Sequence, residues 1–135
     1  MRGIFGIHPG WGLTLVRLSM GLIFTAHGYQ KFMGGMAGVA GYFAKVGVPM
    51  PELMAPVIAT VELVGGILLI LGLATRWVGL VLALEMIVTG FWVQMPTKGW
   101  NASELDRILL AAGLLLLLAG PGRAAVDELW LEKGE

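Results

Sequence analysis

The stretch GLTLVRLSMGLIFTAHGYQKF, Gly12–Phe32, decides the fold because it is long and apolar enough for a membrane-spanning helix yet holds an arginine in its interior. A helix needs roughly 20 apolar residues, at about 1.5 Å of rise each, to cross the hydrocarbon core of a bilayer. A guanidinium in that core costs on the order of 3 kcal/mol on insertion scales, so Arg17 should face protein and not lipid. The sequence therefore predicts a helix bundle that shields Arg17.

The composition of the whole chain agrees with a membrane protein. Of its 135 residues 57 % are hydrophobic and 13 % charged, and the mean hydropathy is +0.82, whereas about 25 % of residues are charged in soluble domains. Four apolar segments, at about 11–32, 53–73, 77–95 and 103–119, predict an all-α fold: a bundle of four transmembrane helices forming a single domain over 1–135. No small-x-small cleavage motif follows the first segment, so we expect a retained span and not a signal peptide.

The segments between the spans predict how the helices are arranged. Tyr42–Val46 is a short amphipathic piece that we expect to form an interfacial helix between spans one and two. Ala74–Arg76 is so short that spans two and three should be antiparallel neighbours. Gly21 and Gly28 share a helical stripe with Arg17 and would let another helix approach closely.

The ends of the chain and of the fourth span give weaker signals. Ser103, with Asp106 three residues on, predicts a capping box at the start of span four. The tail from Arg123 is amphipathic and is expected to lie on the membrane surface. An even number of spans places both termini on one side, and the positive-inside rule slightly favours cytoplasmic termini. The basic residues compared are Arg2, Arg76, Arg123 and Lys133 on the terminal side against Lys31, Lys45 and Lys98 on the other.

Composition also excludes several classes of function. The chain has no cysteine, which rules out thiol chemistry, disulfide exchange and thiolate metal sites within it. Nine basic and nine acidic residues balance, and no Lys/Arg cluster exists, so no nucleic-acid partner is expected. His8 and His27 fall on opposite sides of the predicted bilayer, so we expect no metal site.

The ionisable residues inside the predicted spans are the candidate site. Arg17 lies roughly 9 Å in from the terminal side, Glu85 roughly 12 Å from that side, and Glu62 roughly 14 Å from the opposite side. All three therefore reach similar depths, and Arg17 is expected to pair with Glu62 or Glu85. Residues nearer the opposite side extend this set into a polar interior strip. The candidates for ligand binding or proton relay are Arg17, His27, Lys31, Glu62, Glu85 and Asp106.

Each candidate has a structural interpretation beside the functional one. An ion pair between Arg17 and one of the two glutamates either fixes the register of the helices or is part of a functional site. One of Glu62 and Glu85 can also stay protonated and relay protons. His27 is either a helix-end histidine or, with Lys31 one turn on, a contact to a head group or carbonyl ligand. Asp106 is also explained by the capping box.

Several motifs together resemble the DoxX family of small four-span membrane proteins. The resemblance implies the membrane subunit of a redox complex similar to thiosulfate:quinone oxidoreductase, in the cytoplasmic membrane of a bacterium or archaeon, acting with a soluble or membrane redox partner. It implies no cofactor held by the chain itself apart from a bound quinone. The matching residues are Arg17, Gly21, Phe24, His27, Gly28 and Lys31, then Glu62, Gly65, Gly66, Leu69, Gly72, Leu73, Thr75 and Arg76, then Asp106, Gly120, Pro121, Gly122 and Asp127, with Tyr42, Phe43 and Gly47–Pro49 between the first two sets.

Three hypotheses follow from these observations. The first is a quinone-linked subunit that passes protons through the bundle interior. The second is a non-enzymatic component that binds or transports lipid or another small molecule. The third is a structural membrane partner, including a homo-oligomer, whose charges set helix order. The sequence ranks them in this order.

Overall fold

The structure, a computed structural model, describes residues 3–131, and every regular element in that range is a helix. The predicted all-α class is therefore confirmed. The elements are η1 (Ile4–Gly6), α1 (Gly10–Met33), α2 (Met36–Lys45), α3 (Pro51–Leu71), α4 (Thr75–Ile87), η2 (Val88–Gln94), α5 (Met95–Lys98), η3 (Asn101–Ser103), α6 (Glu104–Ala119) and α7 (Val126–Leu131). Of these, η2 is a stretch of π-helix that joins α4 to α5.

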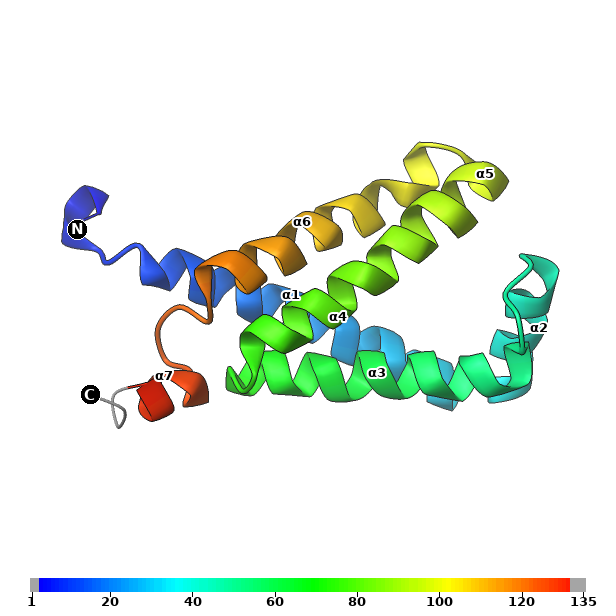
Figure 1. Cartoon of the computed structure of the whole chain (residues 1–135), viewed down its shortest axis with the longest axis horizontal. Helices are drawn as coiled ribbons and strands as arrows, with labels where there is room; N and C mark the ends of the chain where they lie inside the picture. The colour runs from blue at the N-terminus through cyan, green and yellow to red at the C-terminus, as the bar shows by residue number, and fades with distance from the viewer. Residues whose placement is uncertain (1–2, 132–135) are drawn as a thin grey trace.

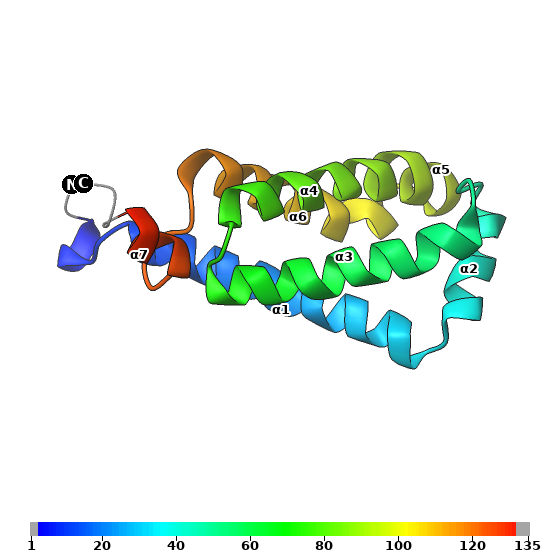
Figure 2. The ribbon, with the colours of Figure 1, turned by 60° about the horizontal axis from the view of Figure 1, so that its bottom comes forward.

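The four long helices form two packed layers. One layer pairs α1 with α3, and the other pairs α4 with α6 (Figures 1 and 2). Apolar side chains from all four helices fill the space between the layers, because each helix turns one apolar face inward. This core contains Met20, Phe24, Leu69, Val78, Leu82, Met86, Leu109 and Leu116.

Glycines set the register within each layer. A Cβ added to Gly28 of α1 would lie 2.5 Å from the backbone nitrogen of Leu63 in α3, so only glycine fits there. In the other layer, a Cβ on Gly79 of α4 would lie 2.8 Å from the carbonyl oxygen of Gly113 in α6. Such close backbone approach is typical of small residues in membrane helices. The expected close contact at Gly28 is confirmed.

The bundle has two different ends. At the α7 end, the turn Gly72–Ala74 joins α3 to α4, and the segment 120–125 leads into α7 (Figure 1). At the α2 end lie α2, α5 and η3. The very short turn makes α3 and α4 antiparallel neighbours, as the sequence predicted.

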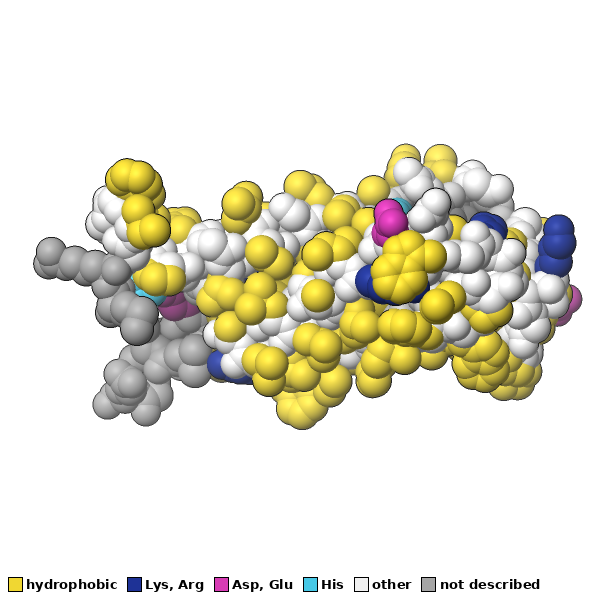
Figure 3. Space-filling view, turned by 90° about the horizontal axis from the view of Figure 1, so that it is seen from above, with side chains coloured by type: hydrophobic (Ala, Val, Ile, Leu, Met, Phe, Trp, Pro, Cys, Tyr) yellow, Lys and Arg dark blue, Asp and Glu magenta, His cyan; other side chains and the backbone are white. Residues whose placement is uncertain are grey.

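Two helical stretches are long and apolar enough to cross a membrane by length and composition: Pro51–Leu71 and Thr75–Lys98. The second joins α4, η2 and α5. Large apolar side chains are exposed along α1 and α6 as well, and Figure 3 shows hydrophobic side chains over much of the visible face. The count of four spans and the interfacial position of α2 stay predictions.

One local prediction, the capping box at Ser103, was wrong. The Ser103 hydroxyl donates to the carbonyl of Trp100 and makes no cap bond to α6, because Ser103 ends the 3₁₀ turn η3. The backbone nitrogen of Asp127 donates to Gly72 O at 2.9 Å, which ties α7 to the α3–α4 turn, and the expected position of the tail on the membrane surface stays a prediction. Arg2 and Lys133, used in the orientation argument, lie outside the described residues.

Candidate functional site

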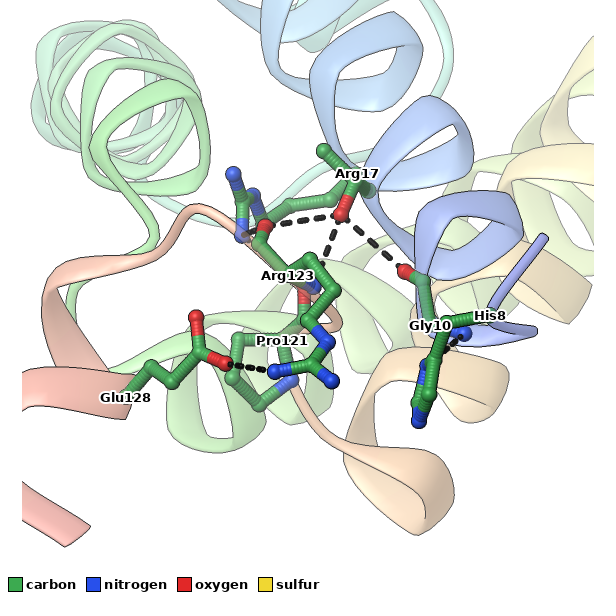
Figure 4. A network of polar contacts seen from close by, with 7 residues as sticks. His8, Gly10, Arg17, Pro121, Arg123 and Glu128 are labelled. Atoms are coloured by element: carbon green, nitrogen blue, oxygen red, sulfur yellow. Dashed lines mark hydrogen bonds and ion pairs between the residues drawn. The ribbon is translucent and has the colours of Figure 1, made fainter. Parts of the chain in front are cut away.

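Arg17 is buried at the α7 end and binds backbone carbonyls. Its Nη1 donates to Pro121 O at 2.8 Å and to Arg123 O at 3.4 Å, and its Nη2 donates to Ala124 O at 2.9 Å. The residue is only 1 % exposed. The chain breaks its helix after Ala119, so these carbonyls have no helical partner, and the guanidinium, with five donors, satisfies them. Figure 4 shows Arg17 beside Pro121 and Arg123.

The expected pairing of Arg17 with Glu62 or Glu85 is therefore wrong. The packing register places Arg17 beside the α3 C-terminus, where a Cβ on Gly72 would lie 2.8 Å from Arg17 Nη1. Glu62 is ten residues away along α3, about 15 Å, which an arginine side chain cannot span. The carboxylates near enough to act on its charge are instead those of Asp127 and Glu128.

Two further residues make polar contacts at the α7 end, and sequence reasoning missed both roles. The Thr14 hydroxyl donates to Arg123 O at 2.7 Å and accepts from Arg123 N at 2.8 Å. The carboxylate of Asp127 accepts from the backbone nitrogens of Ala74 and Thr75, at 2.7 and 2.8 Å, and so caps α4. Because Asp127 lies more than 50 residues from the amides it caps, no local pattern could reveal this.

Lys31 and Glu62 form a half-buried ion pair towards the α2 end. Lys31 Nζ lies 2.6 Å from Glu62 Oε2, and the two side chains are 25 % and 5 % exposed. The helix contact at Gly28, three residues before Lys31, holds α1 against the Glu62 region of α3. Both residues were predicted candidates, but Glu62 finds its partner on Lys31 and not on Arg17.

Glu85 of α4 lies in the same interior region without a partner. Both of its carboxylate oxygens are buried, and neither has a hydrogen-bond partner among residues 3–131. The residue is 9 % exposed. Glu62, Lys31 and Asp106 all lie near enough to act on its charge, and a protonated Glu85 is close enough to Glu62 to donate a hydrogen bond to that carboxylate. A buried carboxyl group with no donor is costly unless it carries a proton or meets a ligand.

Asp106 and His27 extend this group across the bundle. Asp106 of α6 is half-buried and its Oδ2 has no partner among the described residues. His27 of α1 acts on its charge, as do Glu62, Lys31 and Arg107. The His27 ring contacts Phe24 edge-on, with ring centroids 6.4 Å apart. Arg107 stacks on Trp100 at 3.6 Å, so its position at the α2 end is explained by the aromatic contact.

We call these residues the interior polar cluster: His27, Lys31, Glu62, Glu85 and Asp106. They come from α1, α3, α4 and α6, so the cluster joins both layers. It brings together five of the six predicted candidates and leaves out Arg17. Three carboxyl groups face one lysine and one histidine, which gives the cluster more proton and hydrogen-bond acceptors than it can satisfy internally. It can therefore exchange protons or accept hydrogen bonds from a ligand.

An apolar groove that none of the cluster residues lines runs between two of the helices that carry the cluster. Its volume is about 320 Å³, and it follows the seam between α3 and α4. At one end it is lined by Trp77, and at the other by Val61 and Leu82, which precede Glu62 by one residue and Glu85 by three. The groove therefore ends within about one helical turn of two cluster carboxyl groups.

The fold and this cluster define an all-helical membrane protein with ionisable groups inside its bundle. A family model for DoxX matches residues 12–95, and the chain belongs to the DoxX family. It is 40 % identical over 116 residues to a Bacillus subtilis protein named "Putative oxidoreductase CatD", covering 86 % of this chain and 84 % of that protein. The resemblance inferred from the motifs is thus confirmed.

Other relatives carry membrane names. An uncharacterized membrane protein of Mycobacterium tuberculosis is 32 % identical over 130 residues, covering 83 % of this chain and 77 % of its own. The Escherichia coli inner membrane protein YphA is 32 % identical over 123 residues, covering 85 % of this chain and 87 % of its own. No solved structure matches the chain.

Proposed function

We propose that this chain is the membrane subunit of a redox complex, and that it seats a quinone with the head group at the interior polar cluster. In this proposal α1, α3, the continuous stretch α4–η2–α5, and α6 with η3 each cross the membrane. The residues of η3 and α6 together number 19, about 29 Å of helix, which is close to the thickness of the hydrocarbon core. Exposed leucines on α1 and α6 support lipid contact for these helices too.

The observation that carries the proposal is the carboxyl group of Glu85, which is buried among ionisable groups and has no partner in the described part of the chain. Intramembrane ionisable groups are expensive and commonly mark ligand or proton pathways. Here the cost is not offset by an ion pair, since Lys31 is bound to Glu62. A ligand that supplies hydrogen bonds, or a proton, would offset it.

The apolar groove favours a ligand with a long hydrophobic tail. Thr60 is exposed and is the one residue lining the groove that carries a hydroxyl group; the others are apolar or aromatic, or glycine. A tail lying in this groove would bring a polar head to the level of Glu62 and Glu85. Quinones of membranes combine such a head with an isoprenoid tail, and binding sites usually pair an apolar pocket with a few polar groups.

The chemistry of quinone reduction suits the cluster. One quinone takes two electrons and two protons, and its two carbonyl oxygens become hydroxyl groups. The electrons would come from a redox partner, and the cluster carboxyl groups would pass the protons to the carbonyl oxygens. In the quinol that results, one of the two hydroxyl groups can donate a hydrogen bond to Glu85. The oxidoreductase name of the Bacillus subtilis relative supports a redox role.

Titration of the purified protein with the reduced, quinol form of a short-chain ubiquinone analogue tests the proposal. We expect saturable binding that Glu85→Gln weakens about tenfold, because the quinol hydroxyl then donates to a neutral amide oxygen and not to a charged carboxylate. Glu52→Gln is the matched control, because Glu52 is exposed on the first turn of α3. Absence of saturable binding, or equal effects of the two substitutions, would contradict the proposal.

The contribution of the groove is tested with tail length. Val64→Trp should fill the groove, because Val64 lines it and is 48 % exposed. It should weaken binding of a long-tailed quinone about tenfold and leave the short-chain analogue unaffected. Val57→Trp is the control, since Val57 is similarly exposed on α3 but does not line the groove.

The groove also favours a second candidate, a protein that binds lipid without redox chemistry. This candidate predicts that phospholipid competes for the groove as well as a long-tailed quinone does. It also predicts that Glu85→Gln leaves binding unchanged. The two titrations above therefore separate the candidates.

A further inference from the structure

Buried oxygen atoms without hydrogen-bond partners gather on the α2 side of the bundle. Five such atoms lie there in the part of the chain that the structure describes: both carboxylate oxygens of Glu85, Asp106 Oδ2, Gln94 Oε1 and the Tyr42 hydroxyl. Neither Gln94 nor Tyr42 is among the candidate site residues predicted from the sequence. Buried polar atoms are normally paired, so a concentration of unpaired ones needs a physical explanation.

These atoms are spread in order between Glu85 and the α2 end. Glu85 and Gln94 lie on one continuous helical stretch, nine residues and about 12 Å apart. Asp106 lies between them, because a Cβ added to Gly90 would be 3.0 Å from Asp106 Cβ. Beyond Gln94, the ammonium group of Lys98 sits 5.1 Å from the centre of the Tyr42 ring, and Lys98 is exposed.

The π-helical turn η2 makes this arrangement possible. It contains Gly90, whose missing side chain leaves room for Asp106 of α6, and it ends at Gln94. Stretches of π-helix inside α-helices are often found at functional sites, because the wider turn changes which side chains face inward. Here η2 lies directly between Glu85 and the α2 end.

The opposite direction is closed by packing. Between Glu85 and the α7 end, Phe24, Leu69 and Leu82 are all 0 % exposed. At that end a Cβ on Gly72 would lie 2.5 Å from the Cβ of Ala125, and the Arg17 guanidinium occupies the carbonyls of 121–124. In this region the described residues have one unpaired buried oxygen, the Thr75 hydroxyl at the start of α4, which is ten residues and about 15 Å from Glu85 with no other unpaired oxygen between them.

We propose that the oxygens of Asp106, Gln94 and Tyr42 form a proton path that connects Glu85 with the aqueous phase at the α2 end only. The inference rests on the proposed function in that both use Glu85, and it adds the membrane face from which the site exchanges protons. A proton from water at the α2 end binds an Asp106 oxygen and then moves to a Glu85 oxygen, one O–H bond breaking as the next forms. Water donates to and accepts from Gln94 and Tyr42 along the way.

Charged groups from every helix packed around Glu85 set the balance of this transfer. The negative charges of Glu62 on α3 and Asp106 on α6 disfavour a negative charge on Glu85, and the positive charge of Lys31 on α1 favours it. His27, Arg107 and Lys31 all favour a negative charge on Asp106. Proton movement along the path would therefore respond to the Lys31–Glu62 pair.

Single cysteines test the path directly, because the chain contains no cysteine of its own. The protein is reconstituted in vesicles and treated from outside with a charged, membrane-impermeant thiol reagent. Lys45→Cys and Leu129→Cys report which fraction of molecules exposes each end, since Lys45 is exposed on α2 and Leu129 lies on α7 and is 60 % exposed. Gln94→Cys should react to the same extent as Lys45→Cys, and Thr75→Cys, at the α7 end, should not react in either orientation.

A carbodiimide that modifies protonated carboxyl groups in apolar surroundings gives a second measurement. Mass spectrometry should find it on Glu85, its rate should follow the pH on the α2 side alone, and Gln94→Leu should slow the response at least fivefold. If Gln94→Cys fails to fold, Tyr42→Cys replaces it. The proposal is overturned if neither cysteine reacts from the α2 side, if Thr75→Cys reacts equally, or if labelling follows the pH of the α7 side. None of these readouts uses quinone, so they can fail or succeed independently of the quinone titration.

Discussion

Replacing Arg17 tests the strongest structural conclusion, that this residue holds the α7 end together. Its guanidinium makes two short hydrogen bonds, at 2.8 and 2.9 Å, and a longer one at 3.4 Å. Hydrogen bonds to charged groups contribute about 1.5 to 3 kcal/mol each, so the two short ones contribute about 3 to 6 kcal/mol. Alanine avoids the cost of burying a charge, which offsets part of this. We expect Arg17→Ala to lower the free energy of unfolding by about 3 kcal/mol.

The assay is unfolding in mild detergent followed by circular dichroism, together with trypsin cleavage after Arg123. Arg17→Lys should lose about half as much stability as Arg17→Ala, because one ammonium cannot bind both Pro121 O and Ala124 O in the same geometry. Release of the segment 120–125 should also speed cleavage after Arg123 at least tenfold in Arg17→Ala.

Arg123→Ala is the control for stability. The Arg123 side chain is 44 % exposed and makes one ion pair with Glu128 at 3.1 Å, so its loss should cost less than about 1 kcal/mol. If Arg17→Ala is no less stable than Arg123→Ala, the assignment of Arg17 to the α7 end is wrong. The assignment also fails if Arg17→Lys weakens short-chain quinone binding as much as Glu85→Gln does, because Arg17 would then belong to the ligand site.

Three other substitutions test the packing and the polar contacts. Asp127→Ala removes the cap of α4 and should cost about 1 to 2 kcal/mol in detergent unfolding; a neutral result would deny the capping role. Gly28→Ala should cost at least about 2 kcal/mol, because its Cβ would meet α3 backbone, whereas Gly38→Ala, with open space around it, should be neutral or slightly stabilising by thermal unfolding. Lys31→Met leaves Glu62 buried without its partner and should lower the free energy of unfolding by about 3 kcal/mol. Combining Lys31→Met with Glu62→Leu should recover most of this loss. A double variant as unstable as Lys31→Met alone would show that the unpaired charge of Glu62 does not cause the loss.

The sequence by itself determined the helical class, the membrane environment and the short α3–α4 turn. These properties depend on apolar runs and on local chain length, which are visible without any knowledge of packing. The family followed from the order of motifs such as His27–Gly28 and Glu62. The sequence also identified which ionisable residues lie in apolar surroundings, and five of the six proved to lie together.

Only the tertiary structure decided how those residues are paired. The register of α1 on α3 depends on backbone contact at Gly28, and this placed Glu62 beside Lys31 and Arg17 beside Gly72. The carbonyls that bind Arg17 come from a segment more than 100 residues later, where the chain leaves its last long helix. Depth in a membrane can be counted along one helix, but the partner of a buried charge depends on which faces of two helices meet, and that is fixed by packing alone.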